Sequence, residues 1–362
     1  MQVWWVYGAS GVGKSVTAWQ LFEGLAADRI PCAYVDIDQL GMCYPAPETD
    51  PWRDRLKGRV LAGVAGSWAA AGCGRLVVSG VVDPELVGWY ADRLAPYDLR
   101  MCRLAVDDAE LTRRLEARGV DDEWVADALE EARDLEAAGL PGPVVDTTDA
   151  PVADVAATVR AALADAAPVT GSGAADLGTP EGADLETGAL CVTGPTGVGK
   201  SSVAFEMFMS LRTETTTAYV DLEQLGFGQG LADDDLRIAN TAIAWRCFRA
   251  AGARRLVLSG RLRSADERDR LADAIAPTVL RVVGLTADET TYDERVAARG
   301  RGGGPELAGD TLVGAPAEHL AAVAGRAWAE QQRDAGAVAW DASYDTTGRS
   351  AVEVGVEVRS DW

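Results

Sequence analysis

The sequence predicts an α/β fold in which two similar domains follow one another, each with a mostly parallel sheet of about five strands flanked by helices. Short apolar segments of strand length alternate with helical segments along the chain. A glycine-rich segment links a strand to a helix, and the whole order of segments occurs twice. Strands that are apolar on both faces and separated by helices are typical of a parallel sheet covered on both sides.

The repeat defines the two expected domains, because matching stretches occur in the same order in both halves of the chain. The matches are GASGVGKS (8–15) with GPTGVGKS (194–201), AYVDIDQLG (33–41) with AYVDLEQLG (218–226), AGCGRLVVSG (71–80) with AGARRLVLSG (251–260), the arginine-containing stretches that end at Gly119 and Gly300, and DTT (146–148) with DTT (345–347). One shared order indicates duplication. We therefore predict domains at residues 1–167 and 189–362, joined by a flexible linker at 168–188 that is rich in Gly, Ala, Ser, Thr and Asp.

The first copy provides the expected order of elements. A short apolar strand at 3–7 runs into the glycine-rich loop and then into a helix from 14 to about 26. The elements expected after it are a buried strand at 32–37, an Ala-rich helix at about 59–71, a strand at 76–78, a further helix, a strand at 101–106 and a helix at 109–118. In that last helix, Leu111 and Leu115 have the i, i+4 spacing of one buried face.

The formal charge of −22 excludes two classes of partner. Nucleic acids and anionic membrane surfaces both select a basic protein surface. No apolar stretch reaches the roughly 18 residues of a membrane span, and no targeting segment precedes the first strand. Six scattered cysteines and a single histidine supply a zinc site poorly. We therefore expect a cytoplasmic protein that binds neither nucleic acid nor membrane.

The glycine-rich loop has the composition of a phosphate-binding loop. Glycines let the backbone take positive φ and approach an anion, and the following helix directs its positive end to the same place. Lys14 and Lys200 would reach the outer phosphates, while Ser15 and Ser201 would bind Mg²⁺. These two loops hold two of the three lysines in the chain. The nucleotide-binding residues predicted from the loops are Gly8, Ala9, Ser10, Gly11, Val12, Gly13, Lys14 and Ser15, and Gly194, Pro195, Thr196, Gly197, Val198, Gly199, Lys200, Ser201 and Ser202.

Two carboxylates follow the second expected strand of each copy. Asp36 and Asp38 end the stretch AYVDID, and Asp221 and Glu223 stand at the same places in the second copy. A spacing of two on a strand puts both on one face, at the carboxyl edge of the sheet where ligands bind in such folds. One can orient magnesium through water and the other can accept a proton from an attacking hydroxyl. The alternative is that both face solvent or cap the following turn.

Together these features resemble the small-molecule and nucleotide kinases of the P-loop class. The loop GxxxxGKS, the acidic pair after the second strand, the strand ending in SG and the R-x-x-x-R helix are similar to shikimate, gluconate and adenylylsulfate kinases and to the chloramphenicol phosphotransferase-like group. The resemblance covers both copies and implies phosphorylation of a small hydroxyl-bearing molecule with ATP and Mg²⁺. It also implies that Asp36 and Asp221 are the magnesium-linked or general-base carboxylates, catalytic together with Lys14 and Lys200.

The same resemblance implies roles for two arginines in each copy. Arg114 and Arg295 would lie along the nucleotide base. Arg118 and Arg299 would begin a lid and stabilise charge on the transferred phosphoryl group. The alternative is an exposed Arg/Glu helix face that contributes little to stability. The two Asp-Thr-Thr stretches would lie near the base, or would form ordinary turns.

The copies differ where an acceptor should bind. Residues 41–55 contain three prolines and two aromatic residues, whereas residues 226–237 are shorter, acidic and glycine-rich. The segment after Arg118 is acidic, and the segment after Arg299 is glycine-rich. Neither strand ending in SG is followed by the Asp of a second magnesium motif. The halves therefore either take two substrates or pair a working kinase with a regulatory domain in the same chain.

Other function classes share the phosphate-binding loop. A GTP-dependent switch needs an N-K-x-D motif, which the sequence lacks. A mechanical ATPase usually needs longer domains and arginines from a neighbouring subunit. A non-catalytic ATP sensor or scaffold is favoured by the missing second acidic motif and by the few cations in the first lid. We predict the kinase, with an unidentified small-molecule acceptor, and keep the sensor or a P-loop ATPase as the alternative.

Overall fold

The computed structural model describes residues 1–171, 186–232, 236–304 and 309–362. Most of the expected linker, together with short parts of the second acceptor region and the second lid, lies outside the described residues. The chain divides into two compact units. Unit 1 comprises Met1–Gly41, Asp50–Thr179 and Phe227–Leu236, and unit 2 comprises Met42–Thr49, Pro180–Gly226 and Arg237–Trp362.

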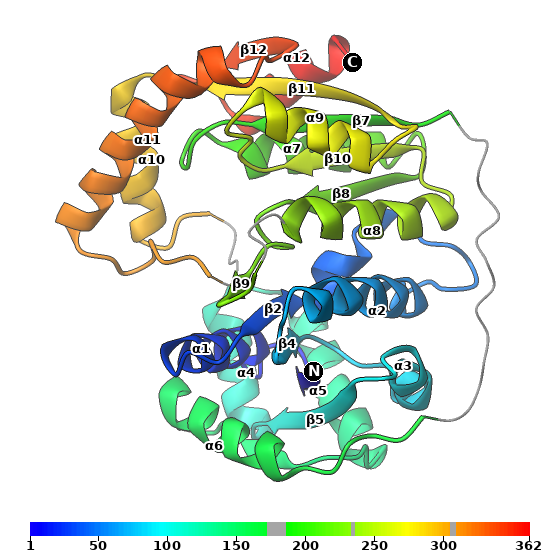
Figure 1. The fold of residues 1–362 in the computed structure, drawn as a ribbon. Helices are drawn as coiled ribbons and strands as arrows, with labels where there is room; N and C mark the ends of the chain where they lie inside the picture. Colours follow the sequence, from blue (N-terminus) through cyan, green and yellow to red (C-terminus); the bar gives the residue numbers. More distant parts are fainter. Residues whose placement is uncertain (172–185, 233–235, 305–308) are drawn as a thin grey trace. The chain divides into compact units, whose positions relative to one another are not determined.

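Unit 1 contains a six-stranded sheet in the order β6-β5-β1-β4-β2-β9, flanked by helices (Figure 1). The strands are β1 (Gln2–Tyr7), β2 (Cys32–Asp36), β4 (Arg75–Ser79), β5 (Asp98–Ala105), β6 (Val144–Asp146) and β9 (Gly228–Gln229). The helices are α1 (Lys14–Ala27), α2 (Asp54–Ala70), α3 (Val87–Arg93), α4 (Asp108–Ala117), α5 (Asp122–Ala137) and α6 (Val152–Asp165), with short 3-10 turns at Ile37–Gly41 and Pro84–Leu86. All strand pairs are parallel except β2 with β9.

Unit 2 repeats this arrangement with the strand order β12-β11-β7-β10-β8-β3. Its strands are β7 (Gly188–Thr193), β8 (Thr217–Asp221), β10 (Arg255–Ser259), β11 (Val279–Thr286), β12 (Ala342–Asp345) and β3 (Cys43–Tyr44). Its helices are α7 (Lys200–Leu211), α8 (Leu236–Ala250), α9 (Ala265–Ala274), α10 (Glu289–Gly300), α11 (Ala317–Ala337) and α12 (Ala351–Ser360). The predicted α/β class with mostly parallel sheets is confirmed. Each sheet, however, has a sixth, antiparallel strand beyond the five that we expected.

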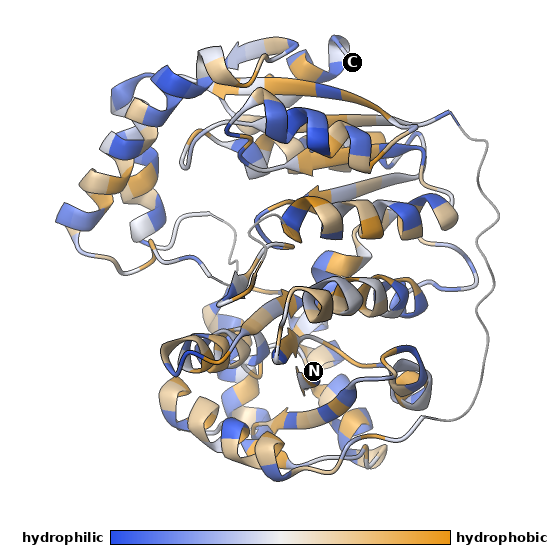
Figure 2. Cartoon of the chain, in the orientation of Figure 1, coloured by the Kyte–Doolittle hydropathy of each residue, from blue (hydrophilic) through white to orange (hydrophobic). Residues whose placement is uncertain are grey.

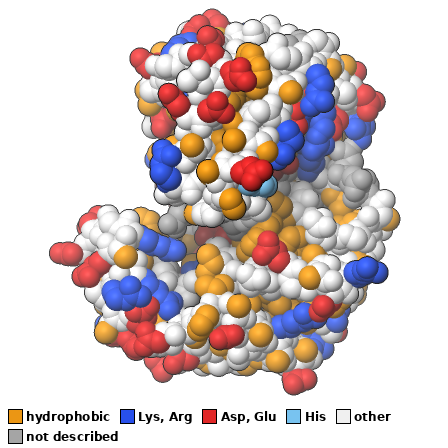
Figure 3. Space-filling model, turned by 90° about the vertical axis from the view of Figure 1, so that its left-hand side faces the viewer, with side chains coloured by type: hydrophobic (Ala, Val, Ile, Leu, Met, Phe, Trp, Pro, Cys, Tyr) orange, Lys and Arg blue, Asp and Glu red, His pale blue; other side chains and the backbone are white. Residues whose placement is uncertain are grey.

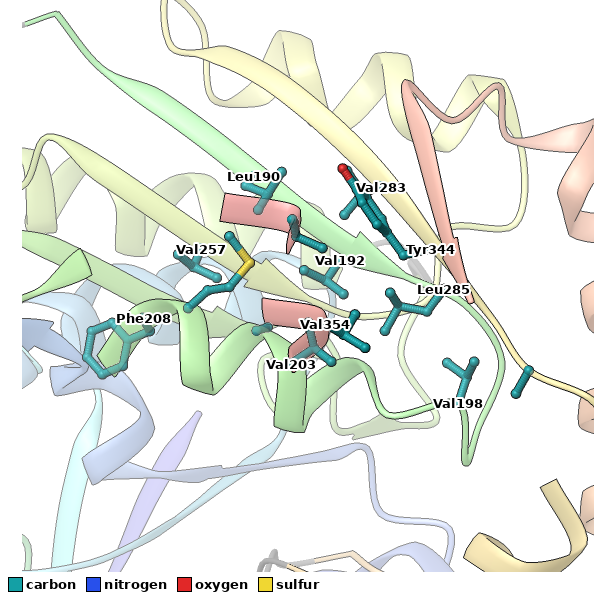
Figure 4. Packing of buried hydrophobic residues seen from close by; sticks show 14 of the residues in the cluster. Leu190, Val192, Val198, Val203, Phe208, Val257, Val283, Leu285, Tyr344 and Val354 are labelled. Carbon is teal, nitrogen blue, oxygen red and sulfur yellow. The ribbon is translucent and has the colours of Figure 1, made fainter. Parts of the chain in front are cut away.

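Apolar strands flanked by helices on both sides explain the two cores. In β1, the residues from Val3 to Tyr7 are all buried, as expected for a strand between two layers. The strands β7 and β11 are mainly hydrophobic in Figure 2, whereas α9 is mainly hydrophilic. In unit 2, Leu190, Val192 and Val283 meet residues of α7 and α12 in one cluster (Figure 4). That cluster also includes Val198 of the second glycine-rich loop, so this loop packs against the core.

The starts of the helices follow local capping. Helix α1 begins at Lys14, directly after Gly13 in the left-handed conformation. Asp107 caps α4, because its side chain accepts a hydrogen bond from the backbone N–H of Glu110. The second helix of the first copy begins at Asp54, five residues earlier than the expected start at about 59. The Asp50 carboxylate accepts from the N–H groups of the first turn and so satisfies donors that would otherwise be unpaired.

The surface carries charges of both signs. On the face shown in Figure 3, acidic and basic side chains are interspersed with hydrophobic and neutral ones. Within the described parts of the chain, no helix has the length and apolar character needed to cross a membrane.

The sixth strand of each sheet comes from the other copy of the repeat. In unit 1, β9 pairs antiparallel with β2, and the N–H of Tyr34 donates to the carbonyl of Phe227 over 3.0 Å. In unit 2, β3 pairs antiparallel with β8, and the N–H of Tyr219 donates to the carbonyl of Met42 over 2.8 Å. The two exchanges use equivalent positions of the repeat.

Aromatic packing accompanies each exchanged strand. The ring of Phe227 contacts Trp19 in unit 1, with ring centroids 4.8 Å apart. The ring of Tyr44 contacts Phe208 in unit 2, with centroids 5.8 Å apart, and lies under the guanidinium of Arg212. Each exchanged segment therefore covers the exposed edge of a sheet and packs a partly buried aromatic side chain against it.

The exchange predicts a specific disulfide. Cys43 faces Ala218 in a non-hydrogen-bonded pair, because the hydrogen bond from Tyr219 to Met42 lies beside it. Such pairs have Cα atoms about 4.5 Å apart, within the range that disulfides span. We expect the new thiol of an Ala218→Cys variant to form a disulfide with Cys43 under mild oxidation. After cleavage at a protease site inserted within residues 172–185, that disulfide should hold the two fragments together on a non-reducing gel.

Two controls make this prediction decisive. Thr217→Cys places the new thiol opposite Tyr44 and should give little crosslinking. Ala33→Cys tests the arrangement without exchange, in which Cys43 would pair with the strand of its own copy. A disulfide inside the first fragment of Ala33→Cys, and none across the cut in Ala218→Cys, would contradict the exchange.

Candidate functional site

The glycine-rich loop of unit 1, which the sequence predicts to bind phosphate, connects β1 to α1. Gly8 and Gly11 have φ values of 151° and 89°, which side chains rarely allow. A Cβ at Gly8 would lie 2.6 Å from the carbonyl oxygen of Leu104, so the loop packs directly on the β5 backbone. Gly13, also at positive φ, allows the first turn of α1 to begin beside the loop. The N-terminus of α1 therefore adjoins a close-packed glycine turn, as phosphate binding requires.

Unit 2 repeats this loop between β7 and α7. Gly194 and Gly197 have φ values of 148° and 88°, close to those of the first loop. A Cβ at Gly194 would lie 2.9 Å from the carbonyl oxygen of Leu285. The residues predicted for the two loops, including Ala9, Ser10, Val12, Pro195, Thr196 and Val198, thus occupy two local structures of the same kind.

The loop lysines lie over their own loops. Lys14 Nζ donates to the carbonyl of Ala9 at 2.8 Å, and Lys200 Nζ donates to the carbonyl of Pro195 at 2.9 Å. Burial lowers the pKa of both ammonium groups below the usual value for lysine. A polyanion bound in the loop would compensate this burial, because opposite charge favours the charged form of lysine.

A serine–aspartate–serine cluster lies beside each loop. In unit 1, the hydroxyls of Ser15 and Ser79 donate to Asp36 Oδ2 at 3.1 and 2.9 Å. The N–H of Asp38 donates to the other oxygen of Asp36 at 3.0 Å, which fixes the carboxylate. The strand β2 supplies the aspartate and β4 supplies Ser79, so the cluster sits at the carboxyl edge of the sheet.

Unit 2 contains the same cluster. The hydroxyls of Ser201 and Ser259 donate to Asp221 Oδ2 at 3.1 and 3.2 Å, and they lie 3.0 Å from each other. The N–H of Glu223 donates to the other oxygen of Asp221 at 3.0 Å. Sequence reasoning did not identify Ser79 and Ser259 as site residues, although the repeated SG at the end of the strand was the available signal.

Burial raises the pKa of the carboxyls of Asp36 and Asp221, and the neighbouring Asp38 and Glu223 raise it further. Hydrogen bonds from the serine hydroxyls and the backbone act in the opposite direction. The arrangement thus holds a carboxylate at low solvent exposure next to a hydroxyl, where a cation would stabilise its charge.

This pKa shift predicts a pH dependence for magnesium binding. A proton and Mg²⁺ compete for the same carboxylate, and a raised pKa means that the proton is retained at higher pH than on an ordinary aspartate. We expect the Mg²⁺-dependent part of ATP binding to weaken on acidification at a pH above the usual range of aspartate titration. Titration of ATP binding with and without EDTA over the same pH series measures it. A Mg²⁺-dependent part that stays constant down to about pH 4, near the ordinary aspartate pKa, would contradict this expectation.

The donor set fits magnesium better than zinc. Among the described residues, no three His, Cys, Asp or Glu side chains gather in a way that could hold a metal ion. Magnesium is typically bound by one or two protein oxygens together with phosphate oxygens and water. Ser15 with Asp36, and Ser201 with Asp221, provide this kind of partial site beside each loop.

A buried cation pairs with the second carboxylate in each unit. In unit 1, Lys57 of α2 lies 3.0 Å from Asp38 and 3.3 Å from Asp54. Burial alone would lower the pKa of Lys57, but the two aspartates raise it above its usual value. Sequence reasoning assigned no role to this residue.

The corresponding cation of unit 2 is Arg237 of α8. It lies 3.6 Å from Glu223 and 2.9 Å from Glu267, and it donates to the carbonyl of Arg261 over 2.7 Å. Lys57 and Arg237 occupy equivalent positions of the two copies but are different residues. Comparing the copies therefore did not reveal that both positions carry a cation. The only hint in the sequence was that Lys57 is the one lysine of the chain outside the two glycine-rich loops.

The first arginine of the R-x-x-x-R pair ties the loop to the last strand of each sheet. Arg114 donates to the carbonyls of Val12 and Thr147 and to the Thr147 hydroxyl, at 3.3, 2.7 and 3.0 Å. Arg295 makes the equivalent bonds to Val198 and Thr346. Each arginine therefore braces the loop against the Asp-Thr-Thr turn, and its placement along a nucleotide base stays a prediction.

The second arginine lies near the loop lysine in each unit. Arg118 ends α4, and its positive charge adds to burial in lowering the pKa of Lys14. Arg299 and Arg261 act in the same way on Lys200, again after burial. In this structure Arg299 is paired with Asp310, 2.5 Å away. The phosphoryl-stabilising role that the resemblance implied for Arg118 and Arg299 stays a prediction.

Comparisons with known proteins give no family by sequence. No family model matches the chain, and no curated protein matches it. Solved structures with similar folds include a sugar kinase from a Janibacter species (16% identity, TM-score 0.34) that matches 45% of this chain and 95% of its own. A gluconokinase from Sinorhizobium meliloti (20%, 0.31) matches 45% and 91%, and the tunicamycin resistance protein of Deinococcus radiodurans (16%, 0.31) matches 48% and 95%. At these identities the likeness concerns the fold alone.

Proposed function

We propose that this chain is an ATP- and Mg²⁺-dependent phosphotransferase that phosphorylates a small hydroxyl-bearing molecule, with a nucleotide site in each unit. The observation that carries the proposal is the partly buried, hydrogen-bonded serine–aspartate–serine cluster beside a lysine-containing glycine-rich loop, present in both units. A glycine turn that merely connected two elements would not need a carboxylate held by two serine hydroxyls next to it. All six cysteines lie in the described parts of the chain and form no disulfide there, which agrees with the cytoplasmic location that we propose for the enzyme.

The loop would bind the triphosphate through its backbone N–H groups, the helix N-terminus and the lysine. The hydroxyls of Ser15 and Ser201 and the carboxylates of Asp36 and Asp221 would hold Mg²⁺. When bound, the ion offsets the charge that develops on the phosphate oxygens. Because these protein groups are already fixed by hydrogen bonds, little reorganisation is needed when nucleotide binds.

The second carboxylate of each pair is the proposed general base. Asp38 and Glu223 lie two residues beyond the proposed magnesium carboxylate, and each forms an ion pair with a buried cation, Lys57 or Arg237. The oxygen of the acceptor hydroxyl would form a bond to the γ-phosphorus. At the same time, the bond between the γ-phosphorus and the β–γ bridging oxygen would break. The proton of the hydroxyl would pass to Asp38 or Glu223, and ADP would leave.

The proposal is tested by measuring Mg²⁺-dependent ADP formation with a broad panel of hydroxylated metabolites. The intact protein, Lys14→Ala, Lys200→Ala and the double variant are compared. We expect at least one panel member to raise ADP formation well above the rate without acceptor, and the double variant to be inactive. If ATP binds but no acceptor raises its turnover, the proposed transferase function fails.

A nucleotide sensor without phosphoryl transfer is the second candidate function. One specific observation favours it in unit 1, where an acidic side chain of α5 contacts the phosphate-binding loop. In that case unit 1 would respond to ATP while unit 2 performs the chemistry.

A further inference from the structure

A glutamate of α5 reaches into the phosphate-binding loop of unit 1. The backbone N–H of Ser10 donates to Glu131 Oε2 at 2.8 Å, although the two residues are 121 positions apart. In a loop of this kind the backbone N–H groups are the ligands of phosphate oxygens. The carboxylate oxygen therefore stands in for a phosphate oxygen at one of the loop's anion-binding N–H groups.

The charge of Glu131 also acts on the loop lysine. Burial lowers the pKa of Lys14, and among the acidic neighbours that oppose this effect, Glu131 is the strongest, ahead of Asp38 and Asp36. Glu131 thus supplies negative charge both to a loop N–H and to the loop cation. These are the two groups that the nucleotide's phosphates would need.

In the equivalent helix of unit 2, two acidic residues are bound elsewhere. Arg261, just after β10, pairs with Glu330 at 2.7 Å and with Asp334 at 2.9 Å, and both acids belong to α11. The position equivalent to Arg261 in unit 1, directly after the SG that ends β4, is Val81, which carries no charge. In unit 2, the guanidinium of Arg261 pairs with these two acids of α11. In unit 1, the uncharged side chain of Val81 at the equivalent position cannot pair with the acids of α5.

We propose that Glu131 is an internal competitor for nucleotide, so that α5 closes the phosphate-binding loop of unit 1 until ATP displaces it. The inference rests on the proposed nucleotide site of unit 1 and adds a regulation to it. Unit 1 then binds ATP more weakly than unit 2 and fills only at higher ATP concentration. Its lid helix moves on binding, which gives the chain one gated site and one open site.

The test measures MgATP affinity of unit 1 in full-length protein carrying Lys200→Ala, which weakens binding at the competing site of unit 2. Glu131→Gln keeps the size of the side chain and removes its charge. Loss of one charge-assisted hydrogen bond from the closed state should tighten ATP binding by about tenfold. The matched control is Glu130→Gln, the same change one residue earlier on the exposed side of α5, and it should leave the affinity unchanged.

A second measurement uses the unaltered protein. Hydrogen exchange of the α5 backbone, Asp122–Ala137, should increase when MgATP saturates unit 1, because the helix loses its anchor on the loop. The circular dichroism spectrum and thermal unfolding of each variant establish that the fold is retained. Glu131→Ala serves in place of Glu131→Gln if the latter does not fold.

The outcomes separate the gating from the site itself. If unit 1 binds ATP and Glu131→Gln does not tighten that binding, or tightens it no more than Glu130→Gln, the gating is wrong and the nucleotide site stands. Unchanged α5 exchange on ATP binding would also overturn the gating. If unit 1 binds no ATP in any variant, both the gating and the assignment of the first loop as a nucleotide site are overturned.

Discussion

Replacing Lys200 with alanine is expected to weaken ATP binding in unit 2 strongly and to remove most of the phosphoryl transfer by the chain. The ammonium of Lys200 is buried against its loop and bonds the carbonyl of Pro195. Its removal takes away the only lysine of unit 2, and the backbone N–H groups of the loop carry no net charge to neutralise a triphosphate. A charge-assisted contact of this kind contributes about 1.5–3 kcal/mol, or roughly 10- to 150-fold in affinity.

Lys14→Ala is the matched variant in unit 1. Under the gating proposed for Glu131, unit 1 binds ATP weakly, so Lys14→Ala should lower the total turnover less than Lys200→Ala does. Calorimetric titration with MgATP counts the remaining sites and measures their affinities. If Lys200→Ala retains two ATP sites of unchanged affinity, the loop of unit 2 is not the nucleotide site that we propose.

Asp221→Asn is expected to separate binding from chemistry. The carboxylate of Asp221 accepts from Ser201 and Ser259 and is the proposed magnesium ligand of unit 2. An asparagine keeps the shape but weakens the hold on Mg²⁺, so transfer in unit 2 should fall by about 10²- to 10⁴-fold while metal-free ATP binding persists. Steady-state ADP formation and ATP titration in EDTA measure the two effects separately.

The same substitution should raise the stability of the protein at neutral pH. Burial raises the pKa of Asp221 above its value in the unfolded chain, so its ionised form is less favourable in the folded state. The asparagine removes that penalty, and the gain should vanish at a pH where the carboxyl is protonated in both states. Thermal unfolding at neutral and acidic pH measures the difference. Asp266→Asn, at an exposed surface ion pair, is the control and should change stability little.

The strands and the loops could be predicted because their causes are local. Apolar strands such as Val3–Tyr7 and the glycine turn before Lys14 leave patterns within a few residues of sequence. The start of α2 was predicted too late because the prediction relied on the spacing of apolar residues. The capping residue, Asp50, lies before the helix and contributes nothing to that spacing. In the first turn of that helix only Leu56 is apolar, so the hydrophobic pattern becomes dense only further along the helix.

The exchanged strands could not be predicted from the sequence. A strand of two residues, such as Cys43–Tyr44, is too short to show a period of two, and its partner lies more than 170 positions away. Nothing in the matching stretches indicates which copy it pairs with. We expected these regions to differ only as acceptor loops, and the structure gives part of each to the sheet of the other copy.

The residues around the second carboxylate and the gating glutamate were hidden for different reasons. Lys57 and Arg237 occupy equivalent positions, and each pairs with the second carboxylate of its unit. Because the two residues differ, comparing the two copies did not reveal this shared role. Glu131 is one of many acids in a chain of net charge −22, and its position became visible only when α5 was placed against Ser10. Long-range contacts of single side chains carry no periodic signal, and they decide much of the site.

The most direct test of the central proposal is the transfer of labelled phosphoryl from ATP to a small molecule. The intact protein is incubated with ATP carrying ¹⁸O in its γ-phosphoryl group, Mg²⁺ and a mixture of hydroxylated metabolites, and the products are analysed by mass spectrometry. The account predicts the label in a new phosphate ester, and its absence when both Asp36→Asn and Asp221→Asn are present. Label found only in inorganic phosphate, or remaining in ATP that is bound by the protein, would contradict it.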